Sequence, residues 1–246
     1  MYMPTSTATI SVIIPAFNGS AFIERALESI LRQSHIPTEI LVVDDGSTDN
    51  TPEIVARFGS RVRYLLKANG GVASARNEGI RQTSGEYIAF LDQDDYWPDD
   101  MLEKTLARFE KEPQWQVVMG LSKVVFEEGA IRERFAVGEE QLTAPFILVS
   151  SALFRRTAFE LVGLFNEELH AANDLDWFNR IREDKVPLVV LPTISLYYSR
   201  HSTNASNDTE WLRMEMMKAL KFSLDRRRIR PEVEAIPTLN SYSVKP

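Results

Sequence analysis

The sequence of 246 residues contains no cysteine. Disulfide bonds, thiolate nucleophiles and cysteine-based metal sites are therefore excluded. No apolar run approaches the ~18 residues that are needed to span a bilayer. The amino terminus has no basic segment, and Pro15 ends its only apolar run, so the sequence shows no signal peptide. These absences predict a cytoplasmic protein.

Positive charge is also scarce. The chain has 28 Lys and Arg against 35 Asp and Glu, a formal net charge of -7, which excludes a nucleic-acid binder that works through a broad basic surface. A Gly-x-Gly-x-x-Gly motif after a strand and a Walker lysine loop are both missing. The hydrophobic fraction of 44% is ordinary for a globular protein, and the length allows one large domain or two small ones.

Strand and helix patterns alternate in the first half of the chain. Apolar runs rich in β-branched residues predict buried strands at residues 10–14, 39–43, 62–66 and 86–91. Helical spacing from Ile23, a cap with proline at Thr51 and Pro52, and residues 72–82 predict three helices between them. Such alternation builds an α/β fold with a mostly parallel sheet flanked by helices.

A loop of polar or glycine-containing sequence follows each predicted strand. The four loops are residues 15–18 (PAFN), 44–49 (DDGSTD), 69–71 (NGG) and 92–95 (DQDD). Ligands of such sheets bind outside the carboxyl ends of the strands, so we expect the four loops to line one site.

The fourth loop begins a stretch with five aspartates within nine positions. Pro98 predicts the first position of a helix, with Asp99 and Asp100 in its first turn, at the positive end of the helix dipole. Asp92 and Asp94 have no such role. Residues two apart on an extended chain point to the same side, so these carboxylates could hold one Mg²⁺ or Mn²⁺ together with substrate phosphates. A solvated acidic turn is the alternative, and spacing alone favours neither.

Four blocks, in order, resemble family 2 glycosyltransferases of the GT-A fold. They are SVIIPAFNGS (11–20), EILVVDDGSTDNT (39–51), NGGVASARNEGI (69–80) and GEYIAFLDQDDYWP (85–98). The resemblance continues to residue 206. It implies a catalytic domain over residues 8–206, followed by a C-terminal helix and a basic, flexible tail over residues 207–246. The implied reaction moves a sugar, with inversion, from a nucleotide diphosphate donor, commonly UDP-linked, to a hydroxyl of a glycan or lipid-linked acceptor in polysaccharide biosynthesis.

The resemblance implies a donor site in the first half. The base and ribose would be held by Pro15, Ala16, Phe17 and Asn18. Phe17 would stack on the base, the alternative being an ordinary core residue. Either Asp44 or Asp45, with Asp45 favoured, would accept a hydrogen bond from the base. Arg76 would lie near the nucleotide or, alternatively, on a solvated helix face, and Asp49 is expected to cap the next helix.

The resemblance also implies a diphosphate site. Asp92, Gln93 and Asp94 would form the metal-diphosphate motif, with Asp94 the firmer ligand of Mn²⁺ or Mg²⁺. Trp97 would shape the sugar pocket or pack before the next helix. His201 resembles a C-terminal histidine that approaches the diphosphate or metal, and a loop histidine without a ligand is the alternative.

The block NDLDWFNRI (173–181) resembles the one in which this family places its catalytic base. Asp174 stands at the position of the base, while Asn173 replaces the glutamate expected before it. The alternative is that Asp174 has only a structural role, as an acid in the first turn of a helix, where the helix dipole favours it. Asp176 fits that structural role better than the role of a base. The Gln-x-x-Arg-Trp block of processive synthases is missing, which favours a non-processive enzyme.

Two other classes of function compete with this interpretation. Phosphatases of the haloacid-dehalogenase type use Asp-x-Asp after their first strand, with Thr or Val beyond the second Asp, whereas here the motif follows the fourth strand and Tyr96 and Trp97 stand beyond it. A non-catalytic nucleotide-sugar or glycan-binding module would keep the fold but would not need Asp174.

The last helical pattern lies outside the family core. Its helical spacing joins Trp211, Met214, Met217, Leu220 or Lys221, and Leu224, and it ends in four arginines. The sequence after it is expected to be a loose tail. Such a helix usually covers its own core, with the arginines solvated. The alternative is a peripheral contact with anionic lipid at the inner face of a membrane.

Overall fold

The computed structural model describes residues 8–130, 142–230, 233 and 236–243. The strands are β1 (Ile10–Ala16), β2 (Glu39–Asp44), β3 (Arg63–Leu66), β4 (Tyr87–Phe90), β5 (Val117–Phe126), β6 (Thr143–Ala144), β7 (Ala152–Arg155) and β8 (Leu188–Arg200). The α-helices are α1 (Ile23–Leu31), α2 (Thr51–Ala56), α3 (Val72–Gln82), α4 (Met101–Lys111), α5 (Arg156–Val162), α6 (Asn173–Glu183) and α7 (Thr209–Arg228).

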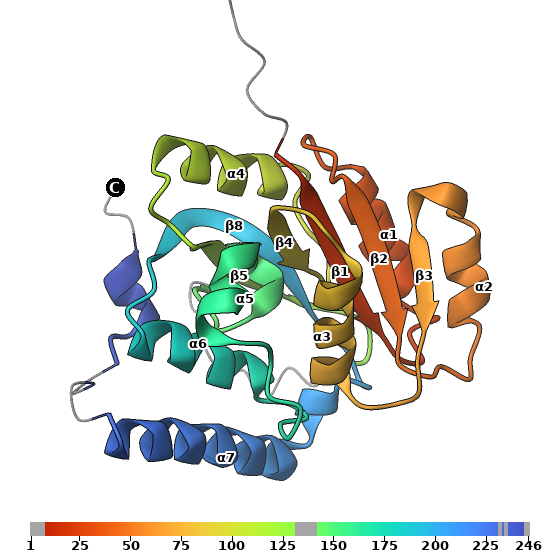
Figure 1. Cartoon of the computed structure of the whole chain (residues 1–246). Helices are drawn as coiled ribbons and strands as arrows, with labels where there is room; N and C mark the ends of the chain where they lie inside the picture. The colour runs from red at the N-terminus through yellow and green to blue at the C-terminus, as the bar shows by residue number, and fades with distance from the viewer. Residues whose placement is uncertain (1–7, 131–141, 231–232, 234–235, 244–246) are drawn as a thin grey trace, which may run out of the picture.

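One mixed sheet separates two layers of helices (Figure 1). Its order is β3-β2-β1-β4-β7-β5-β6, and β8 runs parallel to β5. One apolar cluster joins the sheet to α1, α2 and α4, and a second joins the opposite face to α3, α5 and α6. The α/β prediction is confirmed, and strands β3, β2, β1 and β4 are all parallel.

Strand β1 includes a proline although it lies between two other strands. Residues Ile10 to Ile13 pair with β4, and the Ile13 carbonyl accepts the last hydrogen bond, from Leu91. The nitrogen of Pro15 faces β4, as Ile13 does, but lies beyond the last residue that pairs with β4. The missing N–H of the proline therefore costs no hydrogen bond between the two strands. The pairing of β4 with β1 therefore ends at Leu91.

The start of α4 differs from the prediction. The helix begins at Met101, and not at Pro98, so Asp99 and Asp100 precede its first turn. Gln33, in the loop after α1, accepts a hydrogen bond from the Leu102 N–H at 3.0 Å and donates one to the Pro98 carbonyl at 2.7 Å. This side chain satisfies a free N–H of the first turn, which explains why the helix begins there.

The sequence after α7 also differs from the prediction of a loose tail. Leu239 is buried in the second apolar cluster, and Tyr242 packs against that cluster. Arg182 donates to the Pro237 carbonyl at 3.0 Å, and Ser243 forms a β-bridge with Val190. Residues 236–243 therefore return to the domain. No helix in the described part of the chain is both long and apolar enough to cross a membrane.

Candidate active site

The four predicted loops line one cavity of about 790 Å³ at the carboxyl ends of the parallel strands. The beginning of α6, the segment after β8 and the beginning of α7 complete its wall. Lining residues from the predicted set are Pro15, Ala16, Phe17, Asn18, Asp45, Arg76, Asp92, Gln93, Asp94, Asp174 and His201. A volume of this size is typical of small-molecule and cofactor sites.

An exposed aromatic ring stands at one edge of the cavity. Phe17 is 47% exposed, so it is not an ordinary core residue. Gln93 holds the Phe17 backbone from both sides, because its Oε1 accepts from the Phe17 N–H and its Nε2 donates to the Phe17 carbonyl, each at 3.0 Å. A Cβ at Gly19 would lie 2.1 Å from this Oε1, so glycine is needed beside the amide. The loops after β1 and β4 are thereby locked together.

The two aspartates at the end of β2 have different environments. Asp44 is fully buried and accepts hydrogen bonds from the Tyr64 hydroxyl and the Ser47 N–H, both at 2.7 Å, so it does not reach the cavity as a contact for the base. Asp45 lines the cavity. Its carboxylate accepts from the N–H groups of Gly70 and Gly71 and from Lys67 Nζ, which shapes the loop after β3.

Arg76 connects the two halves of the site. Its Nη2 donates to Asp92 Oδ1 at 2.6 Å, and its Nη1 donates to Asp174 Oδ1 at 2.9 Å and to Asn173 Oδ1 at 2.7 Å. The side chain is only 3% exposed, so the alternative of a solvated helical arginine is wrong. Burial raises the pKa of Asp92, although Arg76 opposes the shift.

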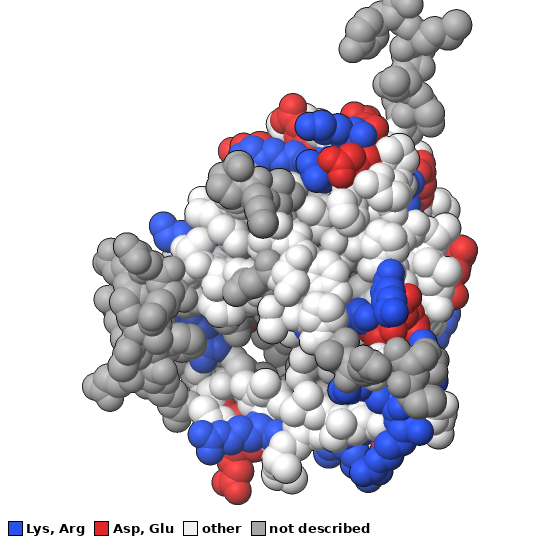
Figure 2. All heavy atoms as spheres, turned by 90° about the vertical axis from the view of Figure 1, so that its left-hand side faces the viewer, with Lys and Arg blue, Asp and Glu red and all other residues white. Residues whose placement is uncertain are grey.

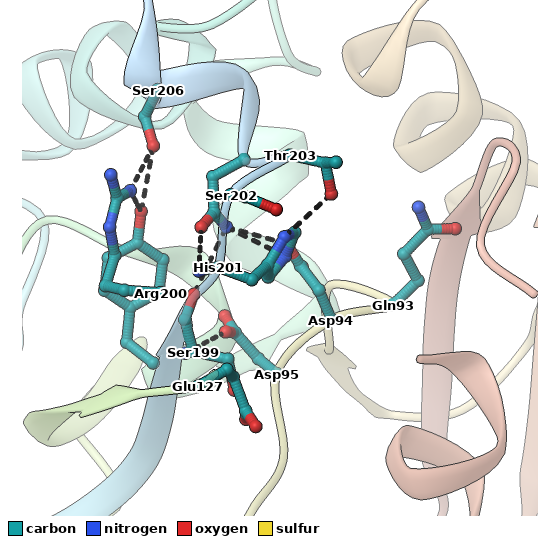
Figure 3. Close-up of polar contacts among 12 residues, drawn as sticks. Gln93, Asp94, Asp95, Glu127, Ser199, Arg200, His201, Ser202, Thr203 and Ser206 are labelled. Carbon is teal, nitrogen blue, oxygen red and sulfur yellow. Dashed lines mark hydrogen bonds and ion pairs between the residues drawn. The ribbon is translucent and has the colours of Figure 1, made fainter. Parts of the chain in front are cut away.

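The second carboxylate of the acidic loop has different partners (Figure 3). His201 Nε2 and Asn204 Nδ2 each lie 3.1 Å from Asp94 Oδ2. The histidine ring stacks on Phe22, and its Nδ1 lies 2.9 Å from Thr203 Oγ1. His201 is therefore fixed beside Asp94 rather than free in a loop.

The backbone of the acidic loop is anchored to the end of β8. Asp95 Oδ1 accepts from the Ser199 N–H at 2.8 Å, and Arg25 Nη2 donates to the Asp94 carbonyl at 2.8 Å (Figure 3 shows the Asp95 contact). Burial, together with the charges of Asp94 and Asp92, raises the pKa of Asp95 well above its ordinary value. These contacts hold the Asp94 carboxylate at the cavity.

The donor set fits a divalent cation that shares its shell with a ligand. Within the described residues, no group of three or more His, Asp or Glu side chains is arranged to hold a metal alone. Asp92 Oδ1 accepts from Arg76, whereas Asp94 Oδ2 lies beside His201 and Asn204, so joint binding of one cation by Asp92 and Asp94 stays a prediction. Asp94 Oδ2 and His201 Nε2, which both border the cavity, are donor types that Mn²⁺ accepts, with diphosphate oxygens left to complete the shell.

The beginning of α6 turns one of its two aspartates into the cavity. Asp174 accepts from Arg76, and its Oδ2 lies 3.3 Å from the Val149 N–H. Asp176 faces away, where Arg180 and Arg226 pair with its carboxylate at 3.1 and 2.8 Å, which confirms its structural role. Asp174 is therefore the acidic residue that α6 presents to a ligand.

Trp97 does not line the cavity, contrary to the expectation of a sugar contact. The side chain is 1% exposed in the first apolar cluster, and its indole N–H donates to the Ser150 carbonyl at 2.7 Å. This bond satisfies the only polar atom of the ring, so Trp97 packs the base of the acidic loop.

Several lining residues were missed by sequence reasoning. They are Phe22, His170, Asn204, Trp211 and Leu212. Asn204 stands in a segment whose family resemblance was recognised, so its proximity to His201 was the available signal. Trp211 and Leu212 carried no signal, because α7 was assigned outside the core.

The comparisons with known proteins agree with this geometry. The sequence profile of "Glycosyl transferase family 2" matches residues 11–163. A chondroitin synthase of Pasteurella multocida is 34% identical over 181 residues, which are 71% of this chain and 19% of that protein. An uncharacterized glycosyltransferase of Rickettsia typhi is 30% identical over 199 residues, 76% of this chain and 63% of that protein. The chain thus spans about a fifth of the first relative and less than two thirds of the second.

Solved structures of S. aureus TarS share the fold. TarS 1-349 in complex with UDP-GlcNAc superimposes with a TM-score of 0.66 at 25% identity, covering 81% of this chain and 61% of that one. A longer TarS structure gives a TM-score of 0.64 at 26% identity, covering 85% of this chain and 39% of that one. The fold is therefore the GT-A type of TarS, and the chain belongs to glycosyl transferase family 2.

Proposed function

We propose that this chain is an inverting, non-processive glycosyltransferase that transfers a sugar from a UDP-sugar to a hydroxyl of a glycan or lipid-linked acceptor. One observation carries the proposal: Asp94 of the acidic loop and Asp174 of α6 line the same cavity, and Arg76 joins Asp174 to Asp92 of that loop. One bound substrate would therefore meet both a residue for binding metal and diphosphate, Asp94, and a general base, Asp174.

The nucleoside would bind at the edge of the cavity formed by the loops after β1, β2 and β3. Phe17 offers a ring face, and Gln93 fixes its backbone. Asp45 accepts from Gly70, Gly71 and Lys67, which leaves about one of its four acceptor sites for a base N–H. UDP is the preferred nucleotide, because the TarS structures include complexes with UDP and with UDP-GlcNAc.

The diphosphate would lie at Asp94, His201 and Asn204. When Mn²⁺ or Mg²⁺ is bound, it supplies Lewis-acid stabilisation for the negative charge of the departing diphosphate. Asp94 and His201 are the residues that would hold it. Arg76 holds Asp92 at the same end of the cavity and adds a positive charge to this otherwise acidic loop.

Asp174 would remove the proton from the acceptor hydroxyl. Arg76 occupies Oδ1 and fixes the carboxylate, while Oδ2 has only the long contact to Val149 and can accept the hydroxyl proton. The hydroxyl oxygen bonds to the anomeric carbon as the bond to the diphosphate oxygen breaks. Attack from the side opposite the diphosphate inverts the configuration.

A thermal-shift screen of nucleotides and UDP-sugars with Mn²⁺ tests the proposal. A donor at a hundred times its dissociation constant should stabilise the protein by ~2.7 kcal/mol. UDP and a UDP-sugar should raise Tm with Mn²⁺ present, and EDTA should remove the shift. A binding module of the same fold would give the shift without release of UDP from the sugar nucleotide, so a UDP-release assay separates the two functions.

A further inference from the structure

Helix α7 carries large hydrophobic side chains on its solvent side. Eleven such residues are exposed in the described part of the chain, and five of them belong to α7, while a sixth, Ile229, follows directly. The five are Met214, Met216, Met217, Leu220 and Leu224. This concentration on one helix is unlike the scattered exposed residues that any globular surface contains.

The side of α7 that faces the domain is small and polar instead. Its buried residues are Glu215, Ala219 and Ser223, which recur every four positions. The expectation that the apolar face of this helix covers its own core is therefore wrong.

Polar contacts fix this rotation of the helix. Glu215 accepts hydrogen bonds from the N–H groups of His170 and Ala171, at 2.6 and 3.2 Å. Arg226 pairs at 2.8 Å with Glu183 and with Asp176 of α6. Because these buried partners would be lost if the helix turned, the apolar side cannot reach the core.

Positive charge shares the outward side. Arg213, Met217, Leu220, Lys221, Leu224 and Arg228 follow the spacing of one helix face, and all six are exposed. Figure 2 shows Lys and Arg side chains at the lower edge of the molecule, at the height of α7 in Figure 1, with uncharged side chains and some acidic atoms among them. This basic face belongs to a chain of net charge -7.

We infer that this outward face of α7 docks on an anionic lipid membrane. The methionine and leucine side chains would enter the headgroup and acyl boundary, and the basic side chains would contact lipid phosphates. A second copy of the helix would bring the same basic face, with Arg213 and Lys221, to the contact, whereas an anionic bilayer offers the complementary charge; Arg228 already pairs with Asp225 at 3.0 Å. Trp211 and Leu212, at the start of the same helix, line the cavity, so docking brings the cavity beside the lipid surface.

Sedimentation with vesicles tests the inference on the whole chain. Phosphatidylcholine vesicles with and without phosphatidylglycerol are compared at low and high salt. We expect the protein to sediment with the anionic vesicles at low salt, to be released as salt screens the charges, and to stay in solution with the neutral vesicles.

Two variants separate the charges from the apolar side chains. Arg213→Gln with Lys221→Gln should weaken partitioning by about fivefold for each charge removed. Met217→Gln with Leu224→Gln should weaken partitioning at low salt but leave the steepness of its salt dependence unchanged, because burial of apolar side chains is not screened. All four side chains are exposed, so Tm should stay at the parental value.

Matched controls lie on other helices. Lys104→Gln with Lys111→Gln removes two exposed charges from α4, on the far side of the domain in Figure 1, and Leu161→Gln changes an exposed leucine of α5. Both should bind vesicles as the parent does. Equal binding by the α7 and α4 variants, or no sedimentation at low salt, would overturn the inference. A dimer in light scattering that Met217→Gln with Leu224→Gln dissociates would also overturn it, in favour of a second copy.

Discussion

Arg76 Nη1 lies 2.9 Å from Asp174 Oδ1, and the same guanidinium holds Asp92 at 2.6 Å. A residue of α3 thus ties the end of β4 to the beginning of α6. Since the arginine is buried and both partners are acidic, it balances charge that would otherwise repel across the cavity. The acidic loop and the beginning of α6, which we propose to be the donor and acceptor sides, are therefore coupled through one side chain.

Arg76→Met should destabilise the protein and impair both sides of the site. Removal of one member of a buried ion pair costs about 3 kcal/mol or more, because the remaining charges lose their partner. Arg76→Lys keeps the charge but cannot serve Asp92 and Asp174 at once, so it should restore stability in part while transfer stays low. Urea unfolding and UDP release measure the two effects. If Arg76→Met unfolded at the same urea concentration as the parent, this role of Arg76 would be contradicted.

Asp94→Asn should abolish the metal dependence of donor binding. The amide is a poorer ligand for Mn²⁺ than the carboxylate, so UDP affinity in the presence of Mn²⁺ should fall to the level seen in EDTA. Asp99→Asn is the matched control, because this nearby aspartate lies on the surface, where Arg32 is its salt-bridge partner at 3.4 Å. Calorimetric titration with UDP measures both variants, and an unchanged response of Asp94→Asn to Mn²⁺ would show that the metal binds elsewhere.

Gly19→Ala should weaken donor binding with little loss of stability. The new Cβ would lie 2.1 Å from Gln93 Oε1, and the flexible amide can move away, but it then releases the Phe17 backbone. Gln93→Ala should have a similar effect on the dissociation constant of UDP. If the two act through the same contact, the double variant should be no weaker than either single one. Additive losses would mean that Gly19 and Gln93 act independently.

Asp49→Ala should destabilise the protein in a pH-dependent manner. Burial acts to raise the pKa of Asp49, but hydrogen bonds from Thr51 and Ser20 outweigh it and lower the pKa to about 2. Because the pKa is lower in the folded protein, the charged Asp49 stabilises the fold fully when the pH is above the ordinary pKa of 3.8. This stabilisation is lost as the pH falls toward 2. Asn50, and not Asp49 as predicted, is the N-cap of α2, so the loss is that of the hydrogen bonds from Ser20 and Thr51. The cost should be about 1 kcal/mol at neutral pH and should shrink between about pH 4 and pH 2. Denaturant titrations at several pH values measure it.

The first half of the fold was predictable because local patterns determine it. Continuous apolar runs could only fill doubly buried strands, and the parallel arrangement then brought four strand-end loops to one edge. Phe17, Asp45 and Asp94 line the cavity for that reason. The antiparallel pairing of β7 with β4 and the long β8 involve distant segments, and short apolar runs do not indicate their partners.

Sequence reasoning failed where a tertiary contact overrides a local rule. Pro98 suits the first position of a helix, yet Gln33, from the loop after α1, binds the Leu102 N–H of α4, and the helix begins later. The apolar spacing of α7 suggested a core-facing side, whereas Glu215 and Arg226 turn that side outward. Trp97 follows the metal motif in the chain, but its bond to Ser150 draws it into the core.

The most direct test of the account compares Asp174→Asn with the parent in two measurements, UDP-sugar affinity with Mn²⁺ by calorimetry and the rate of UDP release with an acceptor. Asn keeps the shape and can still accept a hydrogen bond from Arg76, but it cannot take a proton at neutral pH. Asp176→Asn is the control, because that carboxylate faces Arg180 and Arg226 instead of the cavity.

We predict that Asp174→Asn binds the donor nearly as well as the parent while transfer falls by about 10² to 10⁴, or roughly 3 to 5 kcal/mol of barrier. Asp176→Asn should lose stability but keep its turnover per folded molecule. Near-parental transfer by Asp174→Asn would contradict the assignment of Asp174 as the base, and loss of donor binding in this variant would contradict the separation of donor and acceptor sides.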